Sequence, residues 1–357
     1  MGSWAQITIA GTSLLLVALT ALPFIPSNAS WIRVWDFPRQ QIASLLLAIL
    51  LAALWQFDLR SVGSQAIIAL SAIALGCQAF RIWPYTRLHS VQAERARACP
   101  NNSRVRLLVA NVLVSNRNSS ALIRHIREMQ PDLVLLVETG SWWMSQLQPL
   151  HADYPHFVKH PQEGYGMYLL SRLALIDPRV RHLVDDNIPS IKTGVKLRSG
   201  ATFTFYGLHP APPPLKDTAR RDAELLIVAR EVKDQEESAI VAGDLNDVAW
   251  SHSTHLFQKI SGLLDPRIGR GFYSTYSANW SLLRWPLDHA FFDRSFLLHD
   301  LQVLDDIGSD HFPLFIALCH KPVARVRQDT PQAEPQDRAD ARAAIKEGRE
   351  KASEHGK

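Results

Sequence analysis

The first quarter of the chain has very little charge. Residues 1–87 contain five Lys or Arg and two Asp or Glu, out of 38 and 34 in the whole 357-residue sequence. So little charge argues against a water-exposed domain and favours membrane helices, which need about 20 apolar residues each. Two apolar runs reach that length and one is shorter, and they predict three transmembrane helices at Trp4–Phe24, Gln41–Trp55 and Gln65–Trp83. A cleaved signal peptide is disfavoured, because the first run lacks a basic segment before it and two more runs follow.

Cysteine is scarce too, and three residues cannot build a disulfide framework. Cys99 precedes the first strand expected after the membrane segments, and Cys319 ends the last one. If those strands pair antiparallel, a disulfide is geometrically feasible and would imply an oxidising compartment; two unrelated buried thiols are the alternative. The arginines that follow the third run favour a cytoplasmic domain instead. We therefore expect an integral protein of a bacterial inner membrane, and the sequence leaves the side of residues 88–320 open.

The stretch after the membrane runs lacks an excess of positive charge. Residues 88–320 hold 24 basic and 25 acidic residues. A nucleic-acid enzyme usually carries a basic face, and this balance gives no support for one. Residues 321–357 hold nine basic and seven acidic residues and few large apolar ones, so we predict a charged, disordered tail. The predicted division is a membrane domain at 1–87, a linker at 88–103, a catalytic domain at 104–320 and this tail.

Residues 104–320 alternate between strand-like and helix-like patterns. Apolar runs at Val105–Val112 and Asp132–Glu138 predict buried strands, and helical periodicity appears at Asn118–Met129 and Thr218–Val232. Further short strands are expected at Tyr168–Ser171, Thr193–Leu197, Thr202–Leu208, Ala239–Ala242, Ala290–Phe292 and Phe312–Leu318. Many short strands with few helices predict an α/β fold in which two sheets pack face to face with helices outside.

Polar groups stand at or just after the ends of these apolar runs. A carboxylate at the end of a buried strand is costly unless it is paired or bound to a metal, and Mg²⁺ prefers hard oxygen ligands. Metal-assisted phosphoester hydrolysis also needs a base for water and donors around the phosphoryl oxygens. The residues with this placement are Asn111, Glu138, His209, Asp244, Asn246, Asp288, Asp310 and His311.

This set, and above all the GDLN and SDHFP segments, resembles the endonuclease/exonuclease/phosphatase (DNase I-like) superfamily, in a membrane-anchored branch. The resemblance covers about 104–320 and implies a four-layer α/β sandwich. It also implies metal ligation by Glu138 with Asn111 and Asp310, a water positioned by Asp244, and phosphate contacts from Asn246 and His209. His311, held by Asp288, would stabilise the transition state. Three weaker substrate-binding candidates are Tyr165, Arg220 and Arg221.

These observations lead to one main hypothesis and two alternatives. The main hypothesis is a membrane-anchored phosphoesterase that uses Mg²⁺, with Mn²⁺ as a second option, on a phosphomonoester or phosphodiester. Tethering raises the effective concentration of membrane-resident substrate, so a lipid-linked phosphate is favoured. A membrane-anchored endonuclease or exonuclease on DNA or RNA is the first alternative, and a non-catalytic membrane scaffold is the second. The bilayer and the phosphorylated substrate are the expected partners, and no protein partner is inferred.

Overall fold

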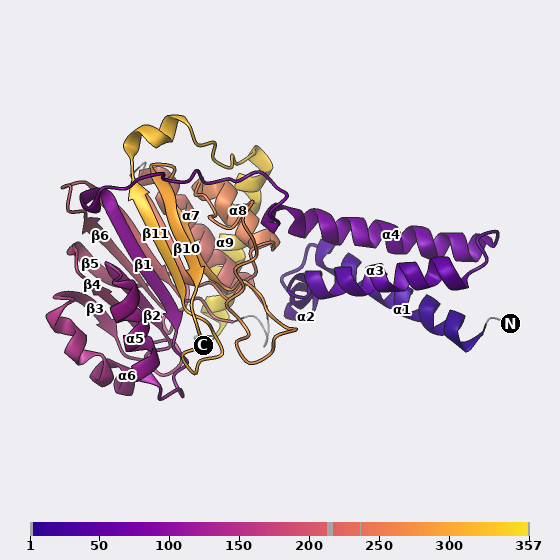
Figure 1. Ribbon diagram of the computed structural model, residues 1–357, viewed down its shortest axis with the longest axis horizontal. Helices are drawn as coiled ribbons and strands as arrows, with labels where there is room; N and C mark the ends of the chain where they lie inside the picture. The colour runs from indigo at the N-terminus through magenta and orange to yellow at the C-terminus, as the bar shows by residue number, and fades with distance from the viewer. Residues whose placement is uncertain (1–2, 213–216, 236, 356–357) are drawn as a thin grey trace.

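The computed structural model describes residues 3–212, 217–235 and 237–355, and it divides into a layered domain and a helical bundle that extends from it (Figure 1). The layered domain contains two mixed sheets. In the first sheet the strand order is β10-β11-β1-β2-β4-β3, and in the second it is β5-β6-β7-β8-β9. The predicted α/β architecture of two face-to-face sheets is confirmed.

The first sheet is built around β1 (Arg104–Asn111) and β2 (Leu133–Val137), which run parallel. Helix α5 (Ser119–Met129) connects them, and Asn118 accepts from the Ala121 N–H as its N-cap. Parallel neighbours joined by a helix place both carboxyl ends at one edge of the sheet. The remaining strands are antiparallel: β3 (His156–His160), β4 (Met167–Ser171), β10 (Phe296–Val303) and β11 (Leu314–His320).

The second sheet repeats this arrangement. Strands β7 (Thr202–Leu208) and β8 (Ala239–Asp244) are parallel, and α7 (Ala219–Gln235) lies between them in the chain. The other strands are β5 (Ala174–His182), β6 (Pro189–Lys196) and β9 (Asp288–Phe292). Strand β9 pairs antiparallel with β8, and its first residue, Asp288, lies opposite Asp244.

Three apolar layers account for the four-layer packing. The inner faces of both sheets form the central core, with Val109, Leu135, Phe205, Ile240 and Phe292 fully buried. On the outer face of the first sheet lie α5 and α6 (Ser141–Gln146), and on that of the second lie α7, α8 (His252–Ser261) and α9 (Pro335–His355). The chain thus buries apolar surface between each pair of layers, as a helix–sheet–sheet–helix sandwich requires.

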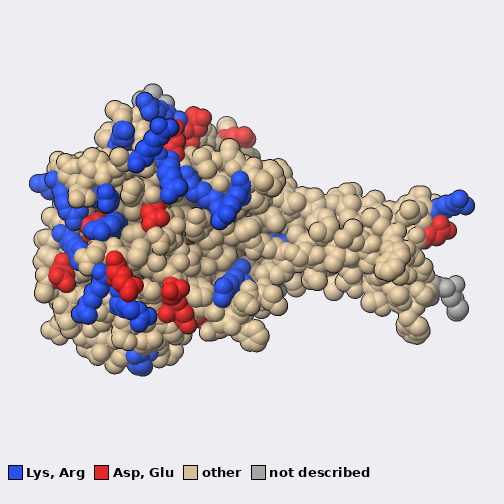
Figure 2. Space-filling view, viewed as in Figure 1, with Lys and Arg blue, Asp and Glu red and all other residues tan. Residues whose placement is uncertain are grey.

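The bundle consists of α1 (Trp4–Ala21), α3 (Arg39–Gln56) and α4 (Val62–Ile82). Each of these helices, with its flanking 3₁₀ turn where one is present, is long and apolar enough to cross a membrane. On the face shown in Figure 2, Lys, Arg, Asp and Glu side chains are scattered over the layered domain, whereas the bundle shows few of them apart from those at its far tip. The chain end N lies at the far tip of the bundle (Figure 1), so α1 runs toward the layered domain, α3 away from it and α4 back.

The bundle is joined to the layered domain by short elements and direct hydrogen bonds. Between α1 and α3 lie α2 (Ser30–Arg33) and a 3₁₀ turn at Val34–Asp36. The indole N–H of Trp250 donates to the Asp36 carbonyl (2.7 Å), and the Tyr85 hydroxyl donates to the Ala249 carbonyl (2.5 Å). After α4 the predicted linker lies extended against β10, where the Ala96 N–H donates to the Leu298 carbonyl (2.8 Å).

The structure contradicts the sequence-based expectation for the tail, and it decides between the two alternatives for Cys99 and Cys319. The expectation of a disordered tail is wrong over most of its length, because α9 packs on α7 and buries Ala341 and Ile345. Two well-spaced apolar groups suffice for docking on an existing surface, although they could not form a core alone. Strands β1 and β11 do pair antiparallel, and Cys99 and Cys319 are joined in a disulfide.

Candidate active site

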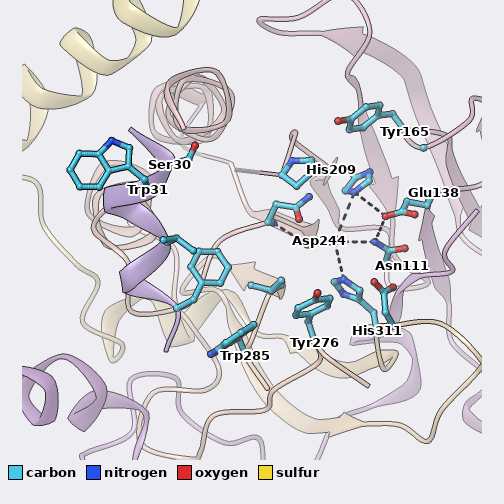
Figure 3. Close-up of a pocket in the computed structure, with 17 residues that line it drawn as sticks. Ser30, Trp31, Asn111, Glu138, Tyr165, His209, Asp244, Tyr276, Trp285 and His311 are labelled. Atoms are coloured by element: carbon cyan, nitrogen blue, oxygen red, sulfur yellow. Dashed lines mark hydrogen bonds and ion pairs between the residues drawn. The ribbon is translucent and has the colours of Figure 1, made fainter. Parts of the chain in front are cut away.

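The predicted site residues come together where the carboxyl ends of the two parallel strand pairs meet across the sandwich. Asn111 ends β1, and Glu138 follows β2 directly. His209 follows β7, and Asp244 ends β8 opposite Asp288. Because the sheets pack face to face, these strand ends converge on one cavity (Figure 3). The loop before β11 adds Asp310 and His311 to its wall.

The Asn111 amide fixes two carboxylates at once. Its Nδ2 donates to Glu138 Oε1 (2.7 Å) and to Asp244 Oδ2 (3.0 Å), and its Oδ1 accepts from the Leu113 N–H (3.0 Å). Both the nitrogen and the oxygen of the amide are therefore hydrogen-bonded, and the nitrogen binds one carboxylate from each sheet. The sequence predicted Asn111 as a metal ligand, and that role stays a prediction; the contacts of its amide position the two neighbouring carboxylates.

Negative charge accumulates at Glu138 and Asp244. Burial raises the pKa of Glu138, the Asn111 hydrogen bond lowers it, and the carboxylates of Asp244 and Asp310 raise it further. Burial is also the main cause of the raised pKa of Asp244, and it outweighs the lowering effect of His311. Carboxylates that resist ionisation because they crowd each other in a buried site are stabilised by a divalent cation, and they offer the oxygen ligands that Mg²⁺ prefers. The donor set therefore fits such a cation.

A second grouping, formed by Asp244, Asp288 and His311, places three possible ligand atoms within 4.8 Å of one another. His311 Nδ1 already contacts Asp288 Oδ2 at 2.8 Å. Burial lowers the pKa of His311, but the carboxylates of Asp244 and Asp288 outweigh it and raise the pKa to about 10. A protonated imidazole cannot bind a metal, so the oxygen donors of Glu138, Asp244 and Asp310 are the better ligands.

The surroundings of His209 shift its pKa in the opposite direction to that of His311. It is buried, and its Nε2 lies 3.9 Å from Asp244 Oδ2 and 4.0 Å from Glu138 Oε1. Burial lowers its pKa to about 4, which exceeds the raising effect of Asp244. Its Nδ1 makes no hydrogen bond within the described residues. His209 is therefore a neutral imidazole that can donate one hydrogen bond into the cavity.

The AGDLND turn has a constrained backbone. Gly243 has φ +146°, and a Cβ there would lie 1.8 Å from the Leu208 carbonyl oxygen, so only glycine fits. Asn246 also has positive φ; its N–H donates to Asp244 Oδ1 (2.9 Å) and its Nδ2 to the Pro210 carbonyl (2.9 Å). The turn thereby locks Asp244 against the segment that carries His209.

The three weaker candidates have different outcomes. Tyr165 lines the cavity with its ring 5.6 Å from that of His209. Arg220 pairs with Asp185 (2.6 Å), outside the cavity wall. Arg221 is buried and pairs with Asp222 and Asp247, and its Nη1 donates to the Asn246 carbonyl (2.8 Å). The expectation that Arg221 meets a substrate is therefore wrong, because its guanidinium is fully used in supporting the AGDLND turn.

The cavity, about 640 Å³, extends from the carboxylates to the root of the bundle. The wall on that side is formed by Ser30, Trp31, Val34 and Phe37. Sequence reasoning missed these residues, and it also missed Tyr276 and Trp285. The Tyr276 ring lies 4.9 Å from that of His311 and stacks on Trp285 (6.0 Å), which meets Phe37 edge-on (5.8 Å). The only sequence signal was a concentration of aromatics near the membrane runs and before PLDHAFF.

Comparisons with known proteins agree with this fold. A sequence model described as the Endonuclease/Exonuclease/phosphatase family matches residues 108–311. No curated protein matches the chain in sequence. D. rerio TDP2 humanized by 14 mutations aligns over 60% of this chain and 99% of its own, at 17% identity and a TM-score of 0.52. The human Nocturnin catalytic domain aligns over 62% and 95%, at 16% identity and a TM-score of 0.50. At these identities the two structures show a shared fold.

Proposed function

Because the chain belongs to the Endonuclease/Exonuclease/phosphatase family, we propose that it is a divalent-metal-dependent phosphoesterase that is anchored in a membrane and acts on a lipid-linked phosphate. The family supports hydrolysis of phosphoester bonds. The anchoring and the lipid substrate go further, and they rest on the three apolar helices and on the cavity that the segment between α1 and α3 helps to form.

One observation carries the lipid assignment. The carboxylates and imidazoles lie at one end of the cavity, and residues of the bundle root, Trp31, Val34 and Phe37, line the other end (Figure 3). A phosphate at Glu138 and Asp244 would therefore have an apolar wall beside it, on the side that faces the membrane. That wall suits the hydrocarbon next to a lipid phosphate. A nucleic acid would instead be expected to meet cations along its backbone.

The geometry suggests a role for each group. A divalent cation held by Glu138 with Asp244 or Asp310 would neutralise charge on the phosphoryl group. Asp244 orients and deprotonates the attacking water. His209, as a neutral donor, and His311, as a cation kept in orientation by Asp288, stabilise the charge that develops on the phosphoryl oxygens. Tyr276 packs against His311 and limits its rotation.

The test is hydrolysis by the full chain in detergent or vesicles with Mg²⁺. The substrates are polyprenyl phosphate, phosphatidic acid, a phosphodiester phospholipid, plasmid DNA and the soluble bis(4-nitrophenyl) phosphate. We expect turnover of a lipid that is abolished by Glu138→Ala and His311→Ala. Glu128→Ala, an exposed carboxylate on α5, is the matched control and should behave as wild type. Cleavage of DNA alone would favour the nuclease alternative, and no hydrolysis of any substrate would favour the scaffold.

The apolar wall gives a sharper test of the lipid assignment. Trp31 lines the cavity from α2, and Figure 3 shows it well apart from Glu138 and Asp244. We expect Trp31→Ala to lower kcat/KM for a long-chain lipid phosphate by about tenfold, which corresponds to the loss of one aromatic contact. Hydrolysis of bis(4-nitrophenyl) phosphate should change by less than about twofold. Equal losses on both substrates would contradict a chain-binding role for this wall.

A further inference from the structure

Three large apolar side chains are clustered on one loop of the catalytic domain. In the segment from Ser277 to Trp285, hereafter the 277–285 loop, Trp280 is 68% exposed, Leu282 83% and Leu283 43%. Single exposed apolar residues are common on soluble surfaces, but a contiguous group marks a contact with a protein, a ligand or a membrane. Elsewhere in the described part of residues 104–320, the exposed large apolar side chains are Phe157 (37%) and Ile176 (45%).

The loop lies beside the start of a membrane helix. Gln41, in the first turn of α3, donates through Nε2 to the Leu282 carbonyl (2.8 Å). A groove of about 900 Å³ separates the loop from this helix; Gln40, Gln41, Ser44 and Leu45 line one side, and Ser281, Leu282 and Arg284 are on the other. With the anchoring proposed above, α3 would enter the bilayer at these turns, and the exposed side chains of the loop would then lie at the level of the membrane interface.

The loop is held in this conformation by its own backbone. The Ser277 N–H donates to the Leu283 carbonyl (3.1 Å), and the Leu283 N–H donates to the Trp280 carbonyl (3.0 Å). At its base the Ala278 N–H donates to the Asp310 carbonyl (2.7 Å), and Tyr276 and Trp285 stack beside His311. Because these hydrogen bonds already order the loop, its apolar tip can bind a partner without a large loss of conformational entropy.

A cation accompanies the apolar tip. The Arg284 guanidinium lies 4.9 Å from the centre of the Phe312 ring and borders the groove. Among the described residues it has no ion pair, and its Nε is buried without a hydrogen-bond partner. Tryptophan and leucine beside an arginine are typical of segments that rest in the headgroup region of a bilayer. A lipid phosphate would supply the missing anion.

We propose that the 277–285 loop is a second membrane contact, which inserts Trp280, Leu282 and Leu283 into the leaflet beside α3 and binds an anionic phospholipid headgroup at Arg284. This inference rests on the membrane anchoring proposed above. The occupant is the lipid monolayer, because the same groove is bounded by a helix that crosses it. The contact would hold the mouth of the active site against the membrane surface, where a lipid substrate resides.

The first test measures depth and does not depend on catalysis. An environment-sensitive fluorophore is attached at Leu282→Cys in a Cys77→Ser background, and the full chain is reconstituted in vesicles with nitroxide lipids. We expect quenching by headgroup and shallow acyl nitroxides. Leu51→Cys, on the exposed face of α3, should be quenched by deep nitroxides, and Ile176→Cys, on β5, by neither. If the fluorophore is quenched at Leu51→Cys but not at Leu282→Cys, the loop contact is overturned and the membrane anchoring stands. If it is quenched at neither position, the anchoring is overturned as well.

The second test compares substrates. Leu282→Ser with Leu283→Ser should lower hydrolysis of a vesicle-borne lipid phosphate by about tenfold and leave bis(4-nitrophenyl) phosphate hydrolysis unchanged. Arg284→Gln should abolish the increase in rate on adding phosphatidylglycerol to phosphatidylcholine vesicles. Ile176→Ser is the control for loss of an exposed apolar group. Equal rates for wild type and the double variant on vesicles would overturn the proposed contact.

Discussion

His209 and His311 lie on either side of Asp244, and their surroundings drive their pKa values in opposite directions. Burial dominates at His209 and keeps it neutral, whereas two carboxylates dominate at His311 and keep it protonated. One residue type thus provides a neutral donor and a cation within the same cavity. Paired groups whose environments separate their pKa values are typical of acid–base and electrostatic catalysis.

Asp288 sets the orientation and the charge of His311 through the 2.8 Å contact at Nδ1. Asp288→Asn removes a negative charge, so the imidazolium is less stable and the His311 pKa falls. We expect kcat to drop by roughly 10²–10³-fold, within the range of a lost acid–base or electrostatic partner. The alkaline limb of the kcat/KM profile should move to lower pH. Asp153→Asn, a surface carboxylate, is the control, and an unshifted alkaline limb would contradict this role for Asp288.

His289 gives a prediction about stability and not activity. It is fully buried; Arg267 Nη2 donates to its Nδ1 (2.6 Å), and its Nε2 donates to the Asp247 carbonyl (2.9 Å). Burial, and then the charge of Arg267, lower its pKa well below 6.5. Below pH 6.5 this imidazole binds a proton in the unfolded chain but stays neutral in the folded chain. As the pH falls, this residue therefore lowers the free energy of unfolding by up to about 1.4 kcal/mol per pH unit.

His289→Gln removes that titration and keeps a donor and an acceptor. The variant should therefore show a shallower fall in the free energy of unfolding between pH 6.5 and 5 than wild type, whatever its stability at pH 7. Denaturant unfolding in detergent at several pH values measures this difference. Parallel curves for the two proteins would show that His289 is not the group responsible.

At the scale of elements, the sequence predicted the buried strands, including the edge strand β9, and missed the other three strands that lie at the edges of the described sheets. The runs at the centre of β1 (Leu107–Ala110), in β2 and at the start of β8 (Ala239–Ala242) are continuously apolar because both faces are covered. Strands β3, β5 and β10 lie at or beside sheet edges, and the first two are largely exposed. Such strands carry charged and polar side chains, so hydrophobic patterning does not distinguish them from loops.

The candidate site divides in the same way. Asn111, Glu138, His209 and Asp244 follow central strands, so their convergence could be foreseen from the sequence. Tyr276, Trp285 and the α2 wall lie on irregular segments, and Phe37 and Trp285 are 248 positions apart in the chain. Local hydrophobic periodicity carries no information about a contact between residues so far apart in the sequence. Tertiary packing alone brings these groups to one cavity.

Helix α9 is the element whose docking was least expected, and Gly348 explains how close it comes to α7. A Cβ at this position would lie 2.4 Å from Ala223 Cβ and 2.5 Å from the Ala219 carbonyl oxygen. In an open helix, glycine to alanine stabilises by about 1 kcal/mol. Here we expect Gly348→Ala to destabilise by about 1–3 kcal/mol, because α9 must shift away.

Thermal unfolding and hydrogen exchange of α9 would measure this effect. Ser353→Ala, an exposed position of the same helix, is the matched control and should be neutral or slightly stabilising. A stabilised Gly348→Ala variant would show that α9 is not docked on α7 in solution. That outcome would restore the sequence-based view of the tail.

At the scale of the whole molecule, the bundle and the catalytic domain form one unit around the cavity. Arg39 is buried in the bundle root, where it pairs with Asp36 and donates to Gln78 (2.9 Å); Gln78 donates in turn to Thr20 (3.0 Å). This network connects α1, α3 and α4 at the root of the bundle. Trp250 and Tyr85 then join the root to the domain. The apolar wall of the active site is therefore fixed relative to the carboxylates.

The orientation of this unit is where two physical signals disagree. Exposed arginines after α4 favour a cytoplasmic domain, but Arg39 is paired and buried and contributes little to that bias. The disulfide between Cys99 and Cys319 needs an oxidising compartment. The disulfide is a specific bond of this structure, whereas the arginine bias is a statistical preference. We therefore expect the catalytic domain on the oxidising side of the membrane.

Cysteine counting in native membranes tests this orientation. Denaturation without reductant should leave only Cys77 open to a mass-shifting maleimide, and reduction should release two more thiols. Cys77→Ser is the control and should show no shift before reduction. Protease added to the oxidising face should then digest the catalytic domain. Three reactive thiols without reductant would place the domain on the reducing side, because two cysteines held this close in an oxidising compartment do not remain free.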